Sequence, residues 1–144
     1  MKRTASATWL GTLEKGQGEI RSESGVLQNS RYTYEGRFTD GRGARETTPE
    51  ELLGAAHAGC YSMALSKILD NRGIRPERID TDATVTLEPT DGTFSITEVH
   101  LATRVEAPGA DRDTFEEAVR EARTECVVSR ALEANVTVDA TLID

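Results

Sequence analysis

The sequence lacks both a long apolar run and an excess of basic residues. No segment approaches the roughly 20 apolar residues that span a bilayer, and the basic start, residues 1–17, lacks the apolar region of a secretory signal. The formal net charge is −8, whereas nucleic acids and anionic membranes select for clustered lysine and arginine. We therefore expect a cytoplasmic protein that binds neither nucleic acid nor membrane.

Cysteine and histidine are also scarce, with two of each in 144 residues. No Cys-x-x-Cys or His-x-x-x-His spacing occurs, so a zinc site would need nearly every available ligand to converge. Cys60 and Cys126 are poor candidates for a structural disulfide in a reducing compartment. They are therefore two buried thiols, a redox pair or half of a metal site.

The chain shows no linker, repeat or low-complexity tract, and its length is normal for one domain, which we place at residues 1–144. Turn residues divide the chain into alternating strand and helix blocks. Strands are predicted within 4–27 and over 30–39, 79–88, 94–105 and 135–143. Helices are predicted over 49–71, from about Asp113, and over about 127–134, and residues 40–48 are predicted to be a polar loop.

The predicted helix at 49–71 has well-defined start signals and an unusual apolar surface. Thr48 suits the N-cap, Pro49 the first helical position, and Glu51 can complete a capping box. Apolar residues cover more than one face, so this helix must be buried nearly all round. Its first half is rich in glycine and alanine, which let another backbone approach closely. A second subunit covers the remaining face most easily, so we expect a homodimer.

Two polar candidates share one face of this helix, because His57 and Cys60 are three residues apart. They could be a nucleophile and its base or part of a metal site, but a lone histidine here is more often a core residue. A buried thiol in apolar surroundings is inert. One guanidinium at about 4 Å would contribute about 4 kcal/mol to a thiolate, or roughly three pKa units. The residues alone leave Cys60 open between the inert and the reactive interpretation.

The charged candidates also have ordinary interpretations. Glu50 and Glu51, as carboxylates in the first helical turn, complement the helix dipole. Arg37 can be a plain solvated residue of a strand.

Three segments resemble the OsmC/Ohr family of thiol-dependent hydroperoxide reductases, and the OsmC branch more than the organic hydroperoxide resistance branch. They are SESGVL at 22–27, TPEELLGAAHAGCYSMALS at 48–66 and ECVVSRALEANVTVDATL at 125–142. The resemblance covers almost the whole chain in order. It implies an α+β fold, with antiparallel sheets packed on a central buried helix, in an intertwined homodimer whose active sites lie at the subunit interface.

The resemblance also assigns four catalytic residues. Cys60 matches the peroxidatic cysteine, and Cys126 matches the resolving cysteine. Arg37 matches the active-site arginine, and Glu50 matches the glutamate that holds it. The implied protein is a peroxiredoxin-like antioxidant enzyme of the stress response, an oxidoreductase with a redox-active disulfide.

The implied reaction needs neither cofactor nor metal. The Cys60 thiolate reduces an organic hydroperoxide to an alcohol and becomes a sulfenic acid, which Cys126 converts to a Cys60–Cys126 disulfide. An external dithiol, carried by a lipoylated protein, restores both thiols. Two alternatives stay open: a redox sensor that signals through a partner protein, and a non-redox dimeric binding module with inert thiols.

Two positions depart from the family pattern. Val127 stands where a proline often follows the second cysteine, and Glu125 stands where a small residue is usual. A carboxylate beside Cys126 would raise the pKa of that thiol. We therefore expect these departures to affect the resolving step more than the first step.

Overall fold

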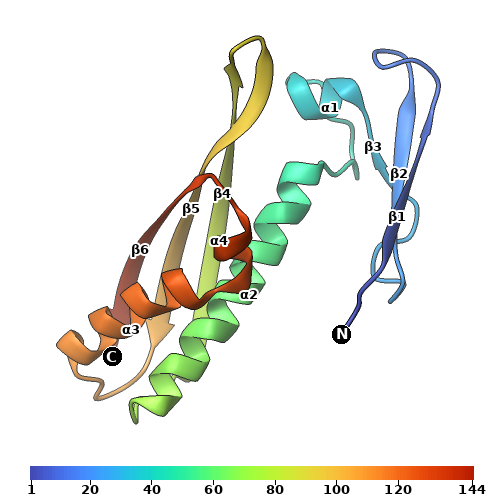
Figure 1. The fold of residues 1–144 in the computed structure, drawn as a ribbon. Helices are drawn as coiled ribbons and strands as arrows, with labels where there is room; N and C mark the ends of the chain where they lie inside the picture. Colours follow the sequence, from blue (N-terminus) through green and yellow to red (C-terminus); the bar gives the residue numbers. More distant parts are fainter. The chain divides into compact units, whose positions relative to one another are not determined.

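The computed structural model describes residues 1–144 and consists of two compact units, Met1–Leu52 and Leu53–Asp144. Each unit contains one three-stranded sheet (Figure 1). The chain thus has the α+β class that the sequence predicts. The single domain over residues 1–144 stays a prediction.

The first unit is built on an antiparallel sheet of β1 (Ala5–Leu10), β2 (Gln17–Ser22) and β3 (Ser30–Tyr32), in that order. These strands confirm the prediction for the segment 4–27. The rings of Trp9 and Tyr32 lie 5.5 Å apart between centroids. Gly18 makes this packing possible, because a Cβ there would lie 2.3 Å from the Tyr32 ring.

The strand predicted over 30–39 is wrong in its second half. β3 ends at Tyr32, and a short helix, α1 (Tyr34–Phe38), follows. Thr33 is the reason for the change, because its hydroxyl accepts a hydrogen bond from Gly36 N at 3.0 Å and so caps the helix. Arg37 therefore lies on a helix and not on a strand.

The long helix α2 (Pro49–Asn71) has the predicted bounds. Thr48 Oγ1 accepts a hydrogen bond from Glu51 N at 3.0 Å, which confirms the N-cap. The capping box is wrong, because the Glu51 carboxylate bonds Thr47 Oγ1 and Arg42 instead of returning to the backbone of Thr48. Those two partners come from the polar loop at 40–48.

The second unit contains a sheet in the order β4 (Arg78–Thr90), β5 (Thr93–Glu106), β6 (Asn135–Ile143). β4 and β5 form an antiparallel hairpin closed by Asp91 and Gly92, which both have positive φ. The expectation of antiparallel sheets is wrong for one ladder, because β6 pairs with β5 in parallel. A parallel pair needs a crossover connection, and two helices between these strands provide it.

These crossover helices are α3 (Arg112–Glu125) and α4 (Val127–Ala131), the second shorter than the predicted 127–134. Helices α2 and α3 cover one face of the sheet (Figure 1). The core between them is made of buried apolar side chains from all three elements, chiefly Tyr61, Leu65, Leu69, Val99, Leu101, Val105, Phe115, Ala118 and Ala122. None of the helices has the length and apolar character that a membrane crossing requires.

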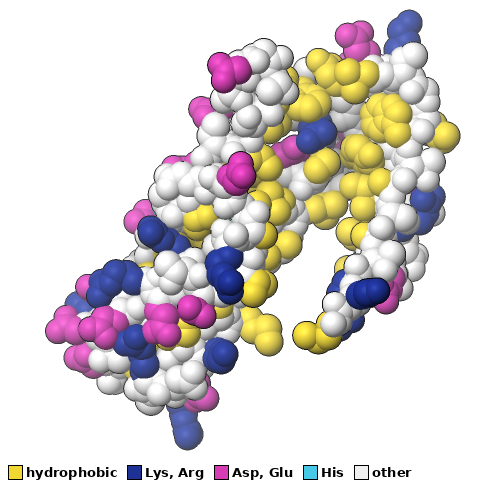
Figure 2. All heavy atoms as spheres, viewed as in Figure 1, with side chains coloured by type: hydrophobic (Ala, Val, Ile, Leu, Met, Phe, Trp, Pro, Cys, Tyr) yellow, Lys and Arg dark blue, Asp and Glu magenta, His cyan; other side chains and the backbone are white.

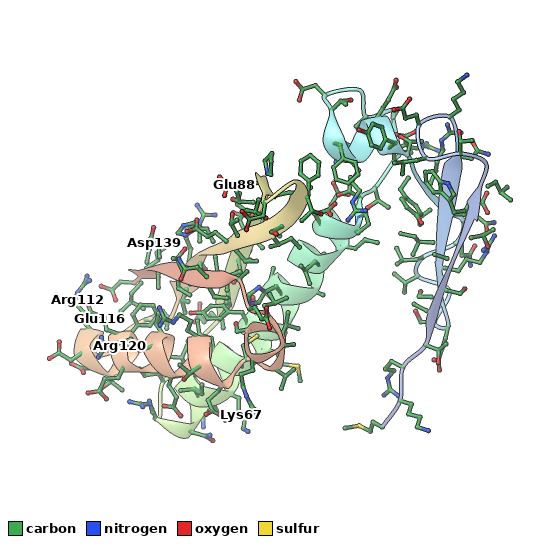
Figure 3. All side chains as sticks on the ribbon, turned by 45° about the horizontal axis from the view of Figure 1, so that its top comes forward. Lys67, Glu88, Arg112, Glu116, Arg120 and Asp139 are labelled. Atoms are coloured by element: carbon green, nitrogen blue, oxygen red, sulfur yellow. The ribbon has the colours of Figure 1, made fainter.

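The outer side of α3 is strongly charged. Arg112, Glu116 and Arg120 follow one another at four-residue intervals on this side of the helix (Figure 3). The space-filling view shows acidic and basic side chains crowded together over α3 (Figure 2). Because the two signs alternate, this surface favours solvent rather than a highly charged partner.

The expectation that α2 is buried nearly all round is not met within one chain. Ala55, Ala56, Gly59 and Met63 lie exposed on one side of the helix, and the Met63 side chain is 78% exposed. An apolar side of small residues thus stays uncovered, as the homodimer prediction requires.

Candidate active site

The two cysteines lie together in the second unit. Cys60 is on α2 and is partly buried, whereas Cys126 precedes α4 and is only 1% exposed. Both are free thiols, and they lie close enough for each to shift the pKa of the other. The structure therefore brings together the two residues that a redox pair needs.

Backbone N–H groups at the start of α4 influence the pKa of both thiols. Burial raises the pKa of Cys60, and the N–H groups of Val128 and Val127 only partly oppose this effect. Burial also acts to raise the pKa of Cys126, but hydrogen bonds from the N–H and the hydroxyl of Ser129 outweigh it. The pKa of Cys126 therefore lies below its ordinary value, while the pKa of Cys60 lies above it.

Glu125 does not act on Cys126 as the sequence suggests. Its side chain is exposed at the end of α3, and the pKa of Cys126 is lowered rather than raised. A carboxylate in water is well screened, so its neighbouring position in the sequence has little electrostatic effect.

His57 is completely buried, which agrees with its interpretation as a core residue. Its Nε2 lies 2.6 Å from Ser129 Oγ, while Nδ1 has no hydrogen-bond partner. Burial lowers the pKa of His57, because the charged imidazolium loses its hydration. The imidazole is therefore neutral near pH 7.

The other two predicted residues form an ion pair in the first unit. Arg37 Nε and Nη2 both donate to Glu50 Oε1, at 2.9 and 2.7 Å. Glu50 is 9% exposed, so its carboxylate is nearly removed from water. The guanidinium carbon also lies 4.8 Å from the centroid of the Phe38 ring. These contacts give the Arg37 side chain a fixed orientation.

Glu46 organises the loop between α1 and α2, a role that the sequence does not reveal. Its carboxylate accepts hydrogen bonds from Arg31 Nε at 3.0 Å, Thr33 Oγ1 at 3.1 Å and Gly43 N at 3.1 Å. The hydrogen bond from Gly43 is the main cause that holds the pKa of Glu46 below its usual value. Glu46 thus supports Thr33, the residue that starts the helix carrying Arg37.

Arg37 also lines an apolar hollow of about 240 Å³ in the first unit. The other lining residues are mainly aromatic or aliphatic: Trp9, Leu13, Tyr32, Thr33, Tyr34 and Phe38. A cation at the wall of an aromatic hollow suits a ligand with one polar end and an apolar body.

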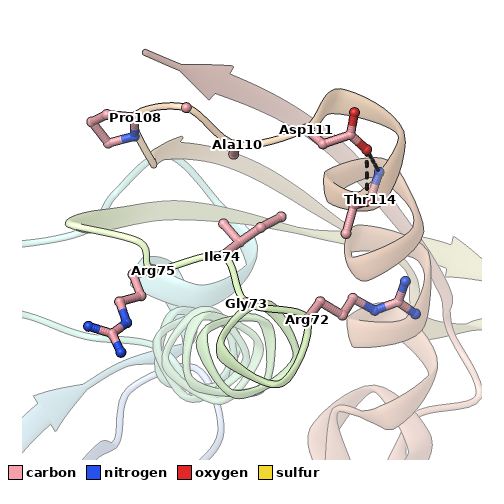
Figure 4. A pocket seen from close by; sticks show the side chains of 9 residues that line it. Arg72, Gly73, Ile74, Arg75, Pro108, Ala110, Asp111 and Thr114 are labelled. Carbon is pink, nitrogen blue, oxygen red and sulfur yellow. Dashed lines mark hydrogen bonds between the residues drawn. The ribbon is translucent and has the colours of Figure 1, made fainter.

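A second hollow lies between the end of α2 and the start of α3 (Figure 4). Asp111 and Thr114 on its wall bond each other, since Asp111 caps α3. Arg72 on the opposite wall is paired with Glu117 and Glu121. This hollow contains no thiol, and two of its charged residues, Arg72 and Asp111, are already paired.

The four predicted catalytic residues therefore come together as two pairs, Cys60 with Cys126 and Arg37 with Glu50, one pair in each unit. No group of three or more His, Cys, Asp or Glu side chains that could hold a metal ion is present. Sequence reasoning missed Ser129, although a serine three residues after Cys126 at a predicted helix start is a usable signal. It missed Glu46 because the side chains that bind Glu46 lie 13 and 15 residues away.

Comparison with known proteins adds independent information. A family model described as OsmC-like protein matches residues 40–141. The chain is 42% identical over 137 residues to Peroxiredoxin OsmC of Escherichia coli strain K12, a match that covers 95% of this chain and 94% of that protein.

Solved structures give the same picture. The organic hydroperoxide resistance protein OhrB of Bacillus subtilis is similar with a TM-score of 0.69 and 27% identity, over 97% of this chain and 98% of that one. An OsmC-like protein of unknown function from Vibrio cholerae shares the fold with a TM-score of 0.78 and 17% identity, over 97% and 99% of the two chains.

Proposed function

The chain belongs to the OsmC-like protein family, and from this membership we infer that it is a thiol-dependent peroxidase that reduces organic hydroperoxides to alcohols. The observation that carries the proposal is the neighbouring pair of free thiols, Cys60 and Cys126. Thiols that served only as core residues would not need to lie next to each other. The relatives named as a peroxiredoxin and as an organic hydroperoxide resistance protein point to the same chemistry.

In the first step, the Cys60 thiolate attacks the terminal oxygen of the hydroperoxide. The O–O bond breaks, the alkoxide takes up a proton to become the alcohol, and Cys60 becomes a sulfenic acid. Cys60 is the attacking thiol because it is the more accessible of the two. Burial raises its pKa, so a cation is needed to hold the thiolate near neutral pH.

We assign that role to Arg37. A guanidinium at about 4 Å contributes roughly 4 kcal/mol to an anion at an effective dielectric constant of 20, and this contribution opposes the effect of burial. Its planar fork of donors also suits the leaving oxygen, whose negative charge develops in the transition state. Glu50 fixes the orientation of the guanidinium through Oε1. Glu50 is thus a positioning residue for Arg37.

The aromatic hollow beside Arg37 supports an organic substrate. Its lining is mostly apolar, so it would accept an alkyl or aryl group, while the guanidinium would hold the peroxide end. Hydrogen peroxide has no apolar part to fill this hollow. We therefore expect cumene hydroperoxide to be preferred over hydrogen peroxide.

In the second step, Cys126 condenses with the sulfenic acid of Cys60. The S–S bond forms, the S–O bond breaks, and the hydroxide leaves as water after it takes up a proton. An external dithiol then reduces the disulfide by two successive exchange steps and is itself oxidised. We propose a protein-bound dihydrolipoyl group as this dithiol, and the reducing cytoplasm as the compartment.

We further propose that the protein is a homodimer. The uncovered side of α2, with Ala55, Ala56, Gly59 and Met63, supports this proposal. Other large apolar side chains are exposed as well, among them Leu10, Leu13 and Val26. A second copy of the chain would cover such surfaces, and light scattering at micromolar concentration should give the mass of a dimer.

Peroxide consumption by the purified protein tests the proposed function. With excess dihydrolipoamide, the protein should consume many equivalents of cumene hydroperoxide, and Cys60→Ser should abolish this turnover. Consumption that stops after one equivalent despite excess dithiol would favour a redox sensor. Absence of consumption, with both thiols unchanged, would favour a non-redox binding module.

A further inference from the structure

His57 is a completely buried titratable residue that the reaction described above does not use. Its Nε2 lies 2.6 Å from Ser129 Oγ. Ser129 is on α4 and His57 is on α2, one turn before Cys60, so this contact joins the two elements that carry the thiols. The contact between His57 and Ser129 therefore links the helix that carries Cys60 to the helix that begins at Cys126.

The direction of this hydrogen bond follows from the other ring nitrogen. Nδ1 is buried and has no partner. A buried N–H without a partner is rarer and more costly than a buried acceptor without one, so the proton lies on Nε2 and Nδ1 carries the lone pair. His57 Nε2–H therefore donates to Ser129 Oγ. The serine hydroxyl is then free to donate onward rather than to the imidazole.

The onward acceptor that the fold offers is the sulfur of Cys126, which lies at the N-cap of α4 three residues before Ser129, and the Ser129 hydroxyl lowers the pKa of this thiol. Donors arranged in one chain strengthen one another, because each polarises the next. A chain from His57 through Ser129 to Cys126 therefore favours negative charge on the Cys126 sulfur.

We propose that Ser129 and His57 activate Cys126 for the resolving step, with Ser129 donating to the attacking sulfur and His57 acting as a positioning residue behind Ser129. This inference rests on the proposed peroxidase function. It assigns the two residues to the second step, whereas Arg37 and Glu50 serve the first.

The step balances without a further reactant. The Cys126 thiolate, whose proton has gone to solvent, attacks the sulfur of the Cys60 sulfenic acid. The S–S bond forms with the electron pair of the thiolate, the S–O bond breaks, and the hydroxide takes a proton from solvent. As Cys126 loses its charge, the Ser129 hydroxyl needs no proton transfer of its own, so the imidazole can stay neutral throughout.

Few titratable groups lie near Cys126 that could contribute to the pH dependence of the resolving step. Cys60, His57 and Tyr61 all come from α2, and the Tyr61 hydroxyl is buried without a partner. Glu125 at the end of α3 is exposed. A change in the pH dependence of the resolving step in a Ser129 variant can therefore be assigned to the donor that was removed.

The test is a single turnover measured separately for each step. Reduced protein is mixed with one equivalent of cumene hydroperoxide, and samples quenched with acid are analysed by mass spectrometry for the Cys60 sulfenic acid and the disulfide. Ser129→Ala should slow disulfide formation about ten-fold at pH 7, or about 1.4 kcal/mol, and should move the pH midpoint of this step upward. Ser129→Thr, which keeps the hydroxyl, should restore most of the rate.

A second pair of variants tests whether the Nε2–H donor of His57 is needed for disulfide formation. Gln places an N–H near the position of Nε2, so His57→Gln should retain much of the rate of disulfide formation, whereas His57→Leu should lose it. Ser95→Ala is the matched control, because it removes a partly buried hydroxyl that bonds Thr90 in another part of the second unit. It should leave both steps unchanged.

The outcomes separate this inference from the proposed function. If Ser129→Ala forms the disulfide as fast as the wild type over the whole pH range, the inference is wrong although the peroxidase function stands. If His57→Leu behaves as His57→Gln does, the imidazole only fills space. If the wild type forms neither the Cys60 sulfenic acid nor the disulfide, the proposed function itself fails. The ultraviolet absorbance of the Cys126 thiolate in a Cys60→Ser background is then still expected to titrate at higher pH in Ser129→Ala.

Discussion

Arg37 places two of its nitrogens, Nε and Nη2, on a single oxygen of Glu50, at 2.9 and 2.7 Å. This arrangement leaves Nη1 outside the ion pair and therefore available to a second anionic group. The nearly buried carboxylate keeps the guanidinium from turning. We accordingly interpret the two residues as one functional unit, in which Glu50 acts only through Arg37.

The first prediction follows from this unit. Arg37→Met keeps the bulk of the side chain but removes the charge, and should lower kcat/KM for cumene hydroperoxide by about a hundred-fold or more. Glu50→Gln should cost less, roughly ten-fold, because the guanidinium remains but is poorly oriented. The double variant should be scarcely worse than Arg37→Met alone.

Arg21→Met is the control for that series, since Arg21 is a partly exposed arginine of the first unit paired with Glu19. It should leave the rate unchanged. Independent, multiplying effects of Arg37→Met and Glu50→Gln would show that Glu50 has a role of its own.

The second prediction concerns Cys126. Cys126→Ser should still reduce about one equivalent of hydroperoxide, because the first step needs only Cys60, and should then stall as a sulfenic acid that over-oxidises with excess peroxide. Mass spectrometry of the Cys60 peptide measures both species. Normal turnover of this variant with a dithiol would mean that Cys126 is not an obligatory resolving thiol.

The third prediction concerns Val127, whose N–H lowers the pKa of Cys60. Val127→Pro removes this N–H at the first position of α4, where proline fits a helix. The pKa of Cys60 should therefore rise. Because the thiolate is the attacking species, the first step should slow near neutral pH.

The pH dependence of Cys60 alkylation in a Cys126→Ser background measures this shift. Val127→Ala, which keeps the N–H, should behave like the wild type. An unchanged pKa in Val127→Pro would show that this backbone donor does not act on Cys60.

The fourth prediction is a pH dependence of stability. Burial lowers the pKa of His57 in the folded state, whereas in the unfolded chain it titrates near its ordinary value of about 6.5. Below that pH the unfolded state binds a proton that the folded state does not, so the free energy of unfolding falls as the pH decreases, by at most about 1.4 kcal/mol per pH unit.

Denaturant unfolding between about pH 5 and 8, at fixed protein concentration, gives the wild-type curve and that of His57→Gln. The difference between the two curves should fall on acidification and level off above about pH 7. A constant difference over this range would mean that the folded protein accepts a proton on His57.

Most elements of the fold could be predicted because their signals are local. The N-cap Thr48 marks the predicted start of α2, and Asp91 and Gly92, which both have positive φ, close the turn between the two strands predicted over 79–88 and 94–105. The parallel pairing of β6 could not be read in the same way. The direction of β6 depends on where α3 and α4 return the chain, which is a property of tertiary packing.

The candidate site shows the same division. Cys60 and Cys126 could be identified from sequence, and so could their likeness to a known family. The sequence did not predict the helix around Arg37, because its alternating aromatic residues are typical of a strand. In the structure, Thr33 caps a helix there, and Glu46 hydrogen-bonds the Thr33 hydroxyl from 13 residues away. The link from His57 to Ser129 spans 72 residues and so leaves no local pattern.

The most direct test of the redox pair is to map the thiols after one equivalent of cumene hydroperoxide. Reduced wild-type protein is treated, alkylated under denaturing conditions, digested without reductant and analysed by mass spectrometry. We predict that both free thiols disappear and that one intramolecular Cys60–Cys126 disulfide accounts for the peroxide consumed. Two intact thiols, or a disulfide between Cys60 residues of different chains, would contradict the proposed chemistry.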